Sequence, residues 1–315
     1  MKVTAFAPAT TANVAVGFDI LGFALEGVGD EVTVELTDQK NKVVILGIEG
    51  IETVLPSDPK KNTAGAALIS MQHELDLNCG FRVQIKKGIA MGSGMGGSSA
   101  SAVGAVVAAH ELLIRKNLIK SLTEERLFHF ALEGEQVASQ SIHGDNVGPC
   151  LLGGLILVLS EKPMRLVKIP TPNDLYSVVV HPDLQVETRT ARALLKREVL
   201  LSSTILQTAH LAGFLAGCFQ SDLELIKRSL TDVLIEPQRS HLIPGFDELK
   251  AQAFNQGALG FSISGSGPSV FAWVKGYPVA KLLSETLTEM FEAKGLNSQA
   301  YVSKLSASGA RVITP

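Results

Sequence analysis

The sequence predicts a mixed α+β fold divided into two domains. The chain has 315 residues, of which 46% are hydrophobic and 19% charged, the balance of a folded protein rather than a disordered one. Strand and helix periodicities alternate along the first half, and helical patterns dominate the second half. A chain of this length can build two cores, so we expect one domain over residues 1–160 and another over residues 161–315.

Short strands dominate the beginning of the chain. Val32, Val34 and Leu36 recur at period two, as expected of a strand in a sheet. Apolar residues at helical spacing first appear after Pro56 and Pro59. The elements expected here are strands within residues 3–35, 42–48 and 81–85, and one helix over residues 63–75.

A helix rich in small residues follows a glycine and serine cluster. Residues 100–113 are mostly Ala and Val, and Arg115 with Lys116 suits a helix C-terminus because cations interact favourably with its dipole. We therefore expect this helix to begin at Ser98 or Ser99.

The next predicted helix carries an acidic residue on an unusual face. Ser121 and Glu124 fit a capping box, and helical periodicity continues to Ser139. Glu135 lies on the small-residue side of this helix rather than on its charged side. This placement marks Glu135 as a candidate ligand or as one partner of a structural ion pair.

The second half begins after an apolar run and a group of prolines. Leu151–Leu159 is nearly continuously apolar and predicts a buried strand. Pro163, Pro170 and Pro172 then mark the expected domain crossing. The remaining predicted elements are helices within residues 189–230, 246–255 and 279–293, strands over residues 258–263 and 270–274, and two closing strands.

Charge, cysteine content and hydropathy exclude several classes of protein. A net charge of -3 gives no electrostatic reason to bind nucleic acid. The cysteines lack metal-ligand spacing and are expected to be reduced core thiols: Cys79, Cys150 and Cys218. The first residues contain no continuous apolar segment of an export signal, so we expect a cytoplasmic protein. The first half of the uncharged stretch 88–109 consists largely of glycine and serine, which argues against a membrane span.

The strongest local motif is the glycine and serine cluster at residues 92–100. It follows a predicted strand and leads into a predicted helix, so its backbone amides can turn toward one centre. The free N–H groups and positive dipole end of the helix favour a phosphate there. A flexible turn without a ligand is the plainer alternative.

The motif does not fit two common nucleotide-binding loops. Gly92, Gly94 and Gly97 satisfy GxGxxG, but the pattern does not follow its strand immediately. The acidic residue that a dinucleotide site requires is also missing, since Glu111 falls within the helix. No Lys followed by Ser or Thr succeeds the glycines, which excludes a P-loop, and neither HRD nor DFG supports a protein kinase. An NAD-dependent oxidoreductase is therefore a weak alternative.

Three segments in order resemble the GHMP small-molecule kinases. They are APATTANVAVGFDILGFAL (residues 7–25), GSGMGGSSASA (residues 92–102) and GALGFSISGSGPSVFAWV (residues 257–274). The resemblance implies the two-domain fold of that family, with an N-terminal domain like domain 2 of ribosomal protein S5 and a ferredoxin-like C-terminal domain. It also implies that the SGSG turn packs beside the glycine loop, whereas by itself this turn is a simple β-turn.

Further segments are similar to the homoserine kinase branch of the family: residues 13–19, 141–149, 188–192 and 236–246. This similarity implies transfer of the ATP γ-phosphoryl group to the side-chain hydroxyl of L-homoserine, giving O-phospho-L-homoserine for threonine biosynthesis. ATP, Mg²⁺ and L-homoserine are the implied ligands, and a homodimer is expected at family level. The alternatives are another GHMP kinase acting on mevalonate or a sugar, and a non-catalytic nucleotide-binding protein.

The resemblance assigns residues to ATP and its metal. Ser98 matches a metal-ligating serine and Glu135 a metal-ligating carboxylate; both are hard oxygen donors suited to Mg²⁺. A one-residue slip in the alignment would exchange Ser98 for Ser99. Asn62 matches a position near the adenine, although a helix N-cap explains it equally well. The implied ATP-binding residues are Asn62, Ala90, Met91, Gly92, Ser93, Gly94, Met95, Gly96, Gly97, Ser98, Ser99 and Ala100.

Departures from the family pattern occur at Ala90, where Pro is common, and at Gly97, where Ser is frequent.

The amino-acid substrate needs cations for its carboxylate and oxygens for its ammonium group. Arg192 and Arg239 match the carboxylate clamps, since a guanidinium binds a carboxylate bidentately. Arg189 is expected to be a solvated helix charge. The residues that match the ammonium side, and the histidine expected beside them, are Asn13, Asp19, Asp145 and His143.

A general base is absent from the expected position. Related kinases place an aspartate where this chain has Asn146, and an amide cannot accept a proton at neutral pH. The implied mechanism passes the hydroxyl proton to a phosphate oxygen, with Asp145 as an orienting group.

Overall fold

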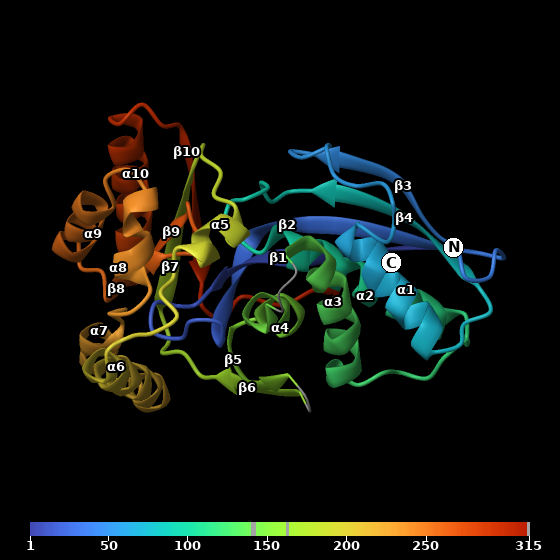
Figure 1. Cartoon of the computed structure of the whole chain (residues 1–315), viewed down its shortest axis with the longest axis horizontal. Helices are drawn as coiled ribbons and strands as arrows, with labels where there is room; N and C mark the ends of the chain where they lie inside the picture. Colours follow the sequence, from blue (N-terminus) through green and yellow to red (C-terminus); the bar gives the residue numbers. More distant parts are fainter. Residues whose placement is uncertain (140–142, 162–163, 314–315) are drawn as a thin grey trace.

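The computed structural model describes residues 1–139, 143–161 and 164–313, and the described residues contain two sheets. The first sheet has seven strands, with β11, β1, β2, β4 and β3 side by side and β5 and β6 attached through β2. The second sheet has four strands in the order β10, β7, β9, β8. Figure 1 shows the first sheet with its helices on one side of the molecule and the second sheet with α9 and α10 on the other.

The first sheet is built mainly from the N-terminal half. β1 and β2 pair antiparallel over most of their length, and β3 runs parallel to β4 with α1 as the connection between them. The strands of this sheet are β1 (Lys2–Ala12), β2 (Leu21–Thr37), β3 (Val43–Gly50), β4 (Gly80–Lys87), β5 (Leu155–Glu161), β6 (Met164–Ile169) and β11 (Arg311–Val312).

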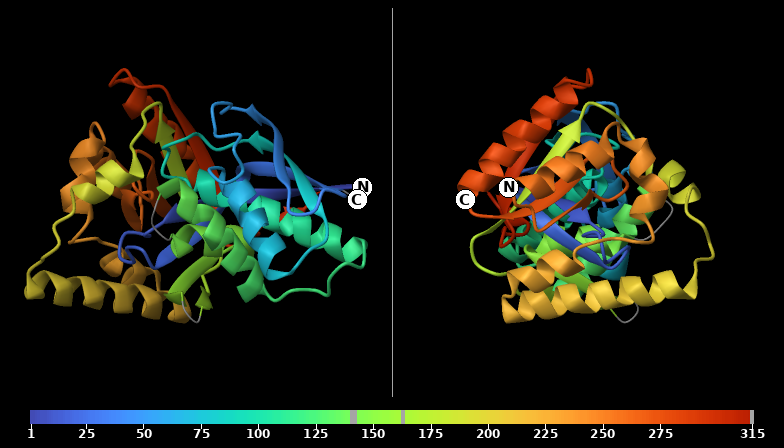
Figure 2. Two further views of the ribbon diagram at one scale, coloured as in Figure 1. Left: turned by 45° about the vertical axis from the view of Figure 1, so that its right-hand side comes forward. Right: turned by 90° about the vertical axis from the view of Figure 1, so that its left-hand side faces the viewer.

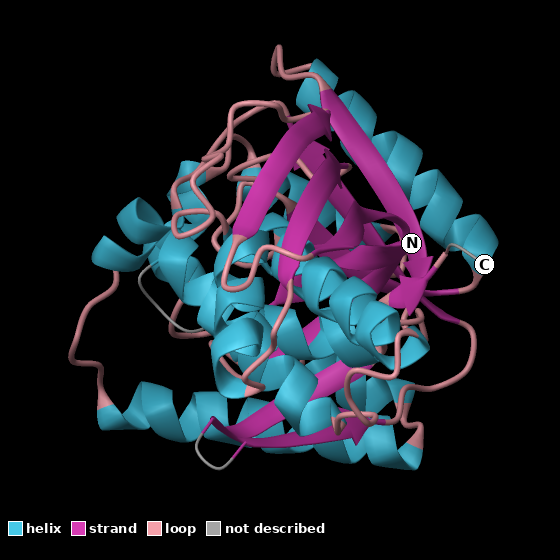
Figure 3. Cartoon of the chain, turned by 90° about the vertical axis from the view of Figure 1, so that its right-hand side faces the viewer, coloured by secondary structure: helices cyan, strands magenta, loops and turns pink. Residues whose placement is uncertain are grey.

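Four helices pack on this half. α2 lies directly against β1 and β2, and α1 and α3 pack on α2. Figure 3 shows helices packed around the strands. The bounds are α1 (Thr63–Glu74), α2 (Gly97–Arg115), α3 (Glu124–Ser139) and α4 (Gly144–Leu152). α2 is long and apolar enough to cross a membrane, but two thirds of it is buried, which is the pattern of a core helix.

The second sheet has the ferredoxin-like arrangement that the resemblance implied. Its chain order is strand, helices, two strands, helix, strand, and all neighbours pair antiparallel. The strands are β7 (Leu175–Pro182), β8 (Gly260–Ile263), β9 (Val270–Lys275) and β10 (Ser298–Lys304). The helices are α5 (Thr188–Ala193), α6 (Leu201–Gln220), α7 (Leu223–Ser229), α8 (Glu236–Arg239), α9 (Phe246–Asn255) and α10 (Tyr277–Glu292), with a 3-10 turn, η1 (Ser240–Leu242), after α8.

The two halves share a hydrophobic core. Phe23 on β2 makes edge contacts with the rings of Phe271 and Trp273 on β9, with centroid distances of 5.7 Å to each. All three side chains are fully buried. The sheets are therefore fixed against one another, and loops from both can meet at one site.

Three local predictions were wrong. The expected strand over Leu151–Leu159 begins only at β5, because the chain ends α4 at Leu152 and turns through Gly153 and Gly154, both with positive φ. Ser121 does not cap α3; the Thr123 hydroxyl accepts from the Arg126 N–H at 3.4 Å, since Thr123 directly precedes the first helical residue.

The third concerns the helix expected to begin at Ser98 or Ser99. α2 begins one residue earlier, at Gly97, because Gly96 takes the left-handed conformation at its N-cap.

The crossing between the sheets follows β6 rather than preceding it. β6 pairs with β5 in the first sheet, so the chain moves to the second sheet after Ile169, beside Pro170 and Pro172. Pro163 lies outside the described residues. The division at residues 160 and 161 falls at the end of β5 and stays a prediction.

Candidate active site

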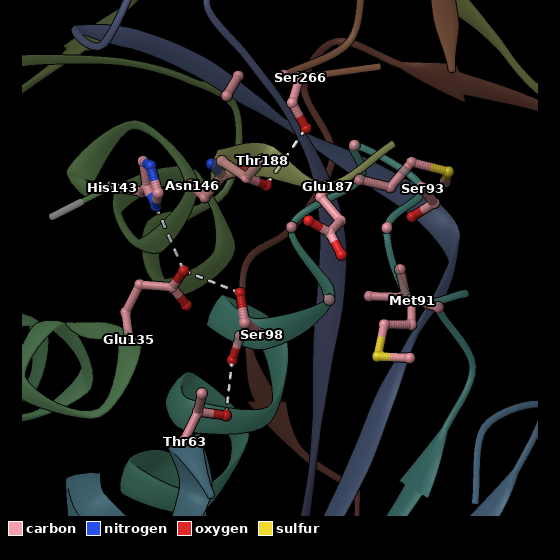
Figure 4. A pocket seen from close by; sticks show the side chains of 18 of the residues that line it. Thr63, Met91, Ser93, Ser98, Glu135, His143, Asn146, Glu187, Thr188 and Ser266 are labelled. Carbon is pink, nitrogen blue, oxygen red and sulfur yellow. Dashed lines mark hydrogen bonds and ion pairs between the residues drawn. The ribbon is translucent and has the colours of Figure 1, made fainter. Parts of the chain in front are cut away.

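A cavity of about 660 Å³ lies where loops from the two halves meet. Its lining includes the glycine loop, the first turn of α2, the start of α4, and the segment from Gln185 to Arg192. Figure 4 shows side chains from these elements directed toward one space. Its volume is within the range of small-ligand sites.

The glycine loop is shaped by left-handed residues in close contact with other segments. Gly92, Gly94 and Gly96 have φ values of 65°, 75° and 69°. A Cβ atom on Gly94 would lie 2.4 Å from the Ser264 carbonyl oxygen, and one on Gly96 would lie 2.1 Å from the Thr10 hydroxyl. Glycine is therefore required here both for the conformation and for the space.

The SGSG turn packs beside this loop, as the resemblance implied. The Ser264 hydroxyl donates to the Gly94 carbonyl at 2.8 Å, and the Ser269 hydroxyl donates to the Ser93 carbonyl at 2.6 Å. Ser93 is thus part of the contact between the two halves.

The N-terminus of α2 opens on the cavity. Its N-cap is Gly96, and no side chain of the described residues caps this end. The first-turn amides and the positive end of the helix dipole are consequently suited to an anion. Gly96, Gly97 and Ser98 line the cavity, whereas Ser99 and Ala100 are buried and do not.

Glu135 joins two serines of this turn. Ser98 donates to Glu135 Oε1 at 2.8 Å, and Ser99 donates to Oε2 at 3.0 Å. Glu135 is only 2% exposed, but both it and Ser98 line the cavity (Figure 4). Of the two serines, Ser98 is therefore the one placed to bind a ligand together with Glu135. A hydroxyl and a carboxylate are hard oxygen donors of the kind that Mg²⁺ prefers.

His143 lies against the same carboxylate. Its Nδ1 is 3.5 Å from Glu135 Oε1. Burial lowers the pKa of His143, but the hydrogen bond and charge of Glu135 outweigh this, and the net pKa is raised. His143 begins the described part of segment 141–149; Ser141 and Ile142 lie outside the described residues.

Asp145 is a buried carboxyl group with an unsatisfied atom. It is 2% exposed, and its Oδ1 has no hydrogen-bond partner among the described residues. Burial raises the pKa of Asp145 to about 7, although the charges of His143 and Arg192 act in the opposite direction. Asp145 lines the cavity, so a cationic ligand group there would stabilise its ionised form.

Asn146 is held by the N-terminal strand. Its Oδ1 accepts from the Thr10 hydroxyl at 2.7 Å. One lone pair of the amide oxygen is thereby used, and the NH₂ group has two hydrogens to donate. That Asn146 does not act as a base stays a prediction, which rests on the weak basicity of an amide.

The two arginines both lie against one aromatic ring. The Arg192 and Arg239 guanidinium carbons are 5.4 and 5.3 Å from the Phe18 ring centroid. Arg239 is buried and donates through Nε to the Ala191 carbonyl at 3.1 Å. Burial, and then the charge of Arg192, lowers the pKa of Arg239 to about 10, so it stays cationic at neutral pH.

Asp19 contacts an arginine directly. Its two oxygens accept from the Arg192 Nη1 and Nη2 atoms at 2.9 and 2.7 Å. This bidentate pairing is the one that a carboxylate ligand would make with Arg192. The hydrogen bond from Arg192 to Asp19 raises the pKa of that guanidinium further.

Two predicted ligand residues also have structural roles. Asn13, with φ 72°, donates to the Gly265 carbonyl at 2.8 Å and accepts from the Asp19 N–H at 3.0 Å. Asn62 caps α1 by accepting from the Ala64 N–H at 3.1 Å, as its plainer interpretation predicted. Both line the cavity.

Sequence reasoning missed several residues of the site. Lys87 is buried beneath the first turn of α2, where it pairs with Asp30 and donates to the Gly97 carbonyl at 2.8 Å. The sequence feature that could have indicated Lys87 as a site residue is its position at the end of a strand, just before the glycine loop. Thr188 and Ser266 join across the cavity with their hydroxyls 3.3 Å apart (Figure 4). No local pattern distinguished them.

The sequence matches the family of GHMP kinases in two places. The GHMP kinases N terminal domain matches residues 62–154, and the GHMP kinases C terminal domain matches residues 214–293. Homoserine kinase of Xylella fastidiosa (strain M12) is 49% identical over 312 residues, which cover 99% of this chain and 94% of that protein. The chain belongs to the GHMP kinase family.

Solved structures agree with this membership. The crystal structure of homoserine kinase from Cytophaga hutchinsonii superposes with a TM-score of 0.94 at 42% identity, covering 99% of this GHMP kinase and 97% of that chain. Mevalonate kinase of L. major in complex with R-mevalonate superposes with a TM-score of 0.67 at 16% identity, covering 96% of each chain, and shares the fold alone.

Proposed function

We propose that this GHMP kinase transfers the γ-phosphoryl group of ATP to the side-chain hydroxyl of L-homoserine. The observation that carries the proposal is the meeting of an anion-binding helix terminus and two arginines in one cavity. Full-length similarity to homoserine kinases at 49% and 42% identity supports the same activity. O-phospho-L-homoserine would then serve threonine biosynthesis, with the enzyme in the cytoplasm.

ATP binds with its phosphates on the glycine loop in this proposal. The amides of residues 92–98 hold the triphosphate, and Asn62 lies near the adenine. Ser98 and Glu135 would hold Mg²⁺, which would supply positive charge to the transferring phosphoryl group. His143, whose pKa Glu135 raises, keeps Glu135 oriented.

L-Homoserine binds between the halves. Arg192 and Arg239 hold its carboxylate, while Asp145 receives its ammonium group on the free Oδ1. The Asp19 carboxylate already binds Arg192, so the substrate carboxylate would either displace Asp19 from this guanidinium or bind to it beside Asp19. Asn13 keeps the loop that carries Asp19 against the SGSG turn.

The reaction proceeds without a dedicated base. The Asn146 amide cannot accept a proton at neutral pH, and Asp145 is engaged with the ammonium group, so the hydroxyl proton passes to a phosphate oxygen. Alignment of the hydroxyl with the phosphorus then supplies most of the catalysis. Turnover that increased strongly in Asn146→Asp would contradict this mechanism.

Release of ADP with homoserine, mevalonate and galactose, each with and without Mg²⁺, tests the proposed function. Of the three acceptors, we expect only homoserine to cause release of ADP, and only in the presence of Mg²⁺. Arg192→Ala should lower the homoserine affinity by about 2 to 5 kcal/mol, because the carboxylate loses its bidentate partner. Turnover of mevalonate instead, or unchanged homoserine kinetics in Arg192→Ala, would refute the substrate assignment.

A further inference from the structure

The carbonyl groups of the glycine loop are bound by segments from outside the loop. The carbonyls of residues 92–94 accept, in chain order, from the Val186 N–H, the Ser269 hydroxyl and the Ser264 hydroxyl. All three donors belong to the second half of the chain, which is coloured yellow to red in Figure 2 and lies beside the first half, coloured blue to green. The second half therefore helps to set the orientation of the glycine loop.

One of these hydrogen bonds is extended by a histidine. The Ser269 hydroxyl donates to the Ser93 carbonyl at 2.6 Å, and the Nδ1 atom of His181 lies 3.1 Å from the same hydroxyl oxygen. Ser269 is fully buried, and His181 on β7 is half-buried. His181, Ser269 and Ser93 come from three separate segments and form one chain of hydrogen bonds that ends in the glycine loop.

The geometry determines which atom of each pair donates. Two oxygens 2.6 Å apart need a hydrogen between them, and because a carbonyl carries none, the single hydroxyl hydrogen of Ser269 lies there. The Ser269 oxygen can then only accept from His181, so the Nδ1 atom of His181 carries a hydrogen. Burial lowers the pKa of His181, although the charge of Asp183 acts in the opposite direction, so the ring is neutral at neutral pH with its hydrogen on Nδ1.

The bond from Ser269 orients an amide beside the cavity. A peptide group is planar and trans, so the Ser93 C=O and the Gly94 N–H lie in one plane and point in opposite directions. A hydrogen bond that holds this carbonyl at Ser269 therefore directs the Gly94 N–H away from Ser269. Ser93 and Gly94 line the cavity, whereas the fully buried Ser269 does not. The Gly94 N–H is consequently available to a phosphate.

We infer that His181 is a positioning residue for ATP, which acts through Ser269 on the peptide plane between Ser93 and Gly94. The inference rests on the proposed binding of ATP at the glycine loop. A donor on one side of the Ser269 oxygen keeps its hydroxyl hydrogen directed at the carbonyl. Without this donor the hydroxyl rotates more freely, so the Gly94 amide is less well preorganised for a phosphate. His181 does not line the cavity, so it acts only through its neighbour.

Isothermal titration calorimetry with Mg²⁺ and the β,γ-imido analogue of ATP tests the inference without any acceptor substrate. His181→Leu should raise the dissociation constant of the analogue about fivefold to tenfold, the effect of one lost hydrogen bond. His181→Asn should stay within about twofold of the unchanged chain, because its Nδ2 atom supplies a donor near the position of Nδ1. His210→Leu is the matched control and should bind the analogue unchanged, since His210 donates from Nδ1 to the Thr231 carbonyl at 2.8 Å and neither residue lines the cavity.

Two further measurements separate positioning from a general loss of structure. Ser269→Ala keeps the backbone N–H that donates to the Ser93 carbonyl at 3.3 Å, should raise the dissociation constant as His181→Leu does, and carries the test should that variant not fold. Adding His181→Leu to Ser269→Ala should change little, because the chain of hydrogen bonds is already broken. In steady-state assays of His181→Leu, the KM for ATP should rise while the KM for homoserine stays unchanged. Circular dichroism verifies the fold of each variant.

Nuclear magnetic resonance of the ¹⁵N-labelled histidines tests the direction of the hydrogen bond. The signal that is missing from the spectrum of His181→Asn belongs to His181 and should show a hydrogen on Nδ1 at neutral pH. A hydrogen on Nε2 alone would overturn the inference.

The outcomes distinguish this inference from the proposed function. The role of His181 would be overturned by equal dissociation constants of His181→Leu and the unchanged chain, by an equal rise in His210→Leu, or by a His181→Asn variant as weak as His181→Leu. These results leave the proposed function intact. A chain that binds the analogue with the expected pattern but releases no ADP with homoserine would contradict the proposed function and support the role of His181.

Discussion

Gly94→Ala tests whether the contact between the glycine loop and the SGSG turn sets the catalytic geometry. Gly94 has φ 75°, which costs an alanine about 1 to 2 kcal/mol. Its Cβ would also lie 2.4 Å from the Ser264 carbonyl oxygen and 2.7 Å from that of Gly267. Both obstacles are backbone atoms, so no side chain can rotate away.

Relief of the shorter contact to an ordinary 3.4 Å separates the two loops by about 1 Å. A misplacement of that size at a phosphoryl-transfer site costs about 100-fold in rate. We therefore expect kcat/KM for ATP to fall by about two orders of magnitude in Gly94→Ala, as measured by ADP release with homoserine.

Gly257→Ala is the matched control for this experiment. Gly257 has φ 88°, but nothing lies within 4 Å of the position that its Cβ would take. This variant should lose about 1 to 2 kcal/mol of unfolding free energy and keep its kcat/KM. If Gly94→Ala and Gly257→Ala have the same kcat/KM, the packing of the two loops does not control catalysis and the reasoning is refuted.

Three further predictions concern buried charges. Burial raises the pKa of Asp145 in the folded protein from 3.8 to about 7, so the stability that this carboxyl group contributes is full below pH 4 and is lost as the pH rises to 7. Asp145→Asn should remove this pH dependence, which amounts to up to about 4 kcal/mol in the free energy of unfolding. Parallel curves of unfolding free energy against pH for the two proteins would contradict the shift. Lys87→Met should lower the free energy of unfolding, measured by urea denaturation, by about 3 to 5 kcal/mol, because it leaves Asp30 buried without its cation. The double variant Lys87→Met with Asp30→Asn should recover part of this lost stability. If the losses of the two single variants simply add in the double variant, the Lys87–Asp30 ion pair does not stabilise the protein. Glu135→Gln should raise the Mg²⁺ concentration needed for half activity about tenfold or more, whereas Glu133→Gln on the same helix should not; identical Mg²⁺ curves would remove Glu135 from the metal site.

Local sequence patterns predicted the parts of the site that depend on neighbouring residues. The glycines at 92, 94 and 96 and the helix behind them are adjacent in the chain, so turn formation and the helix N-terminus could be inferred directly. Helical periodicity likewise placed Glu135 on the side of α3 that meets α2.

Contacts between distant segments could not be predicted in this way. Lys87 pairs with Asp30 because β4 lies beside β2, and Asp19 meets Arg192 only after both halves have folded. The order of the second sheet and the position of β6 depend on the same long-range pairing. Resemblance to a family supplied Arg192 and Arg239, whose role no local pattern indicates.

A crystal structure with a non-hydrolysable ATP analogue, Mg²⁺ and L-homoserine tests the central claim most directly. We expect the triphosphate on the first turn of α2, the metal between Ser98 and Glu135, and the amino-acid carboxylate between Arg192 and Arg239. A triphosphate bound elsewhere, or a homoserine carboxylate remote from both arginines, would contradict the proposed site.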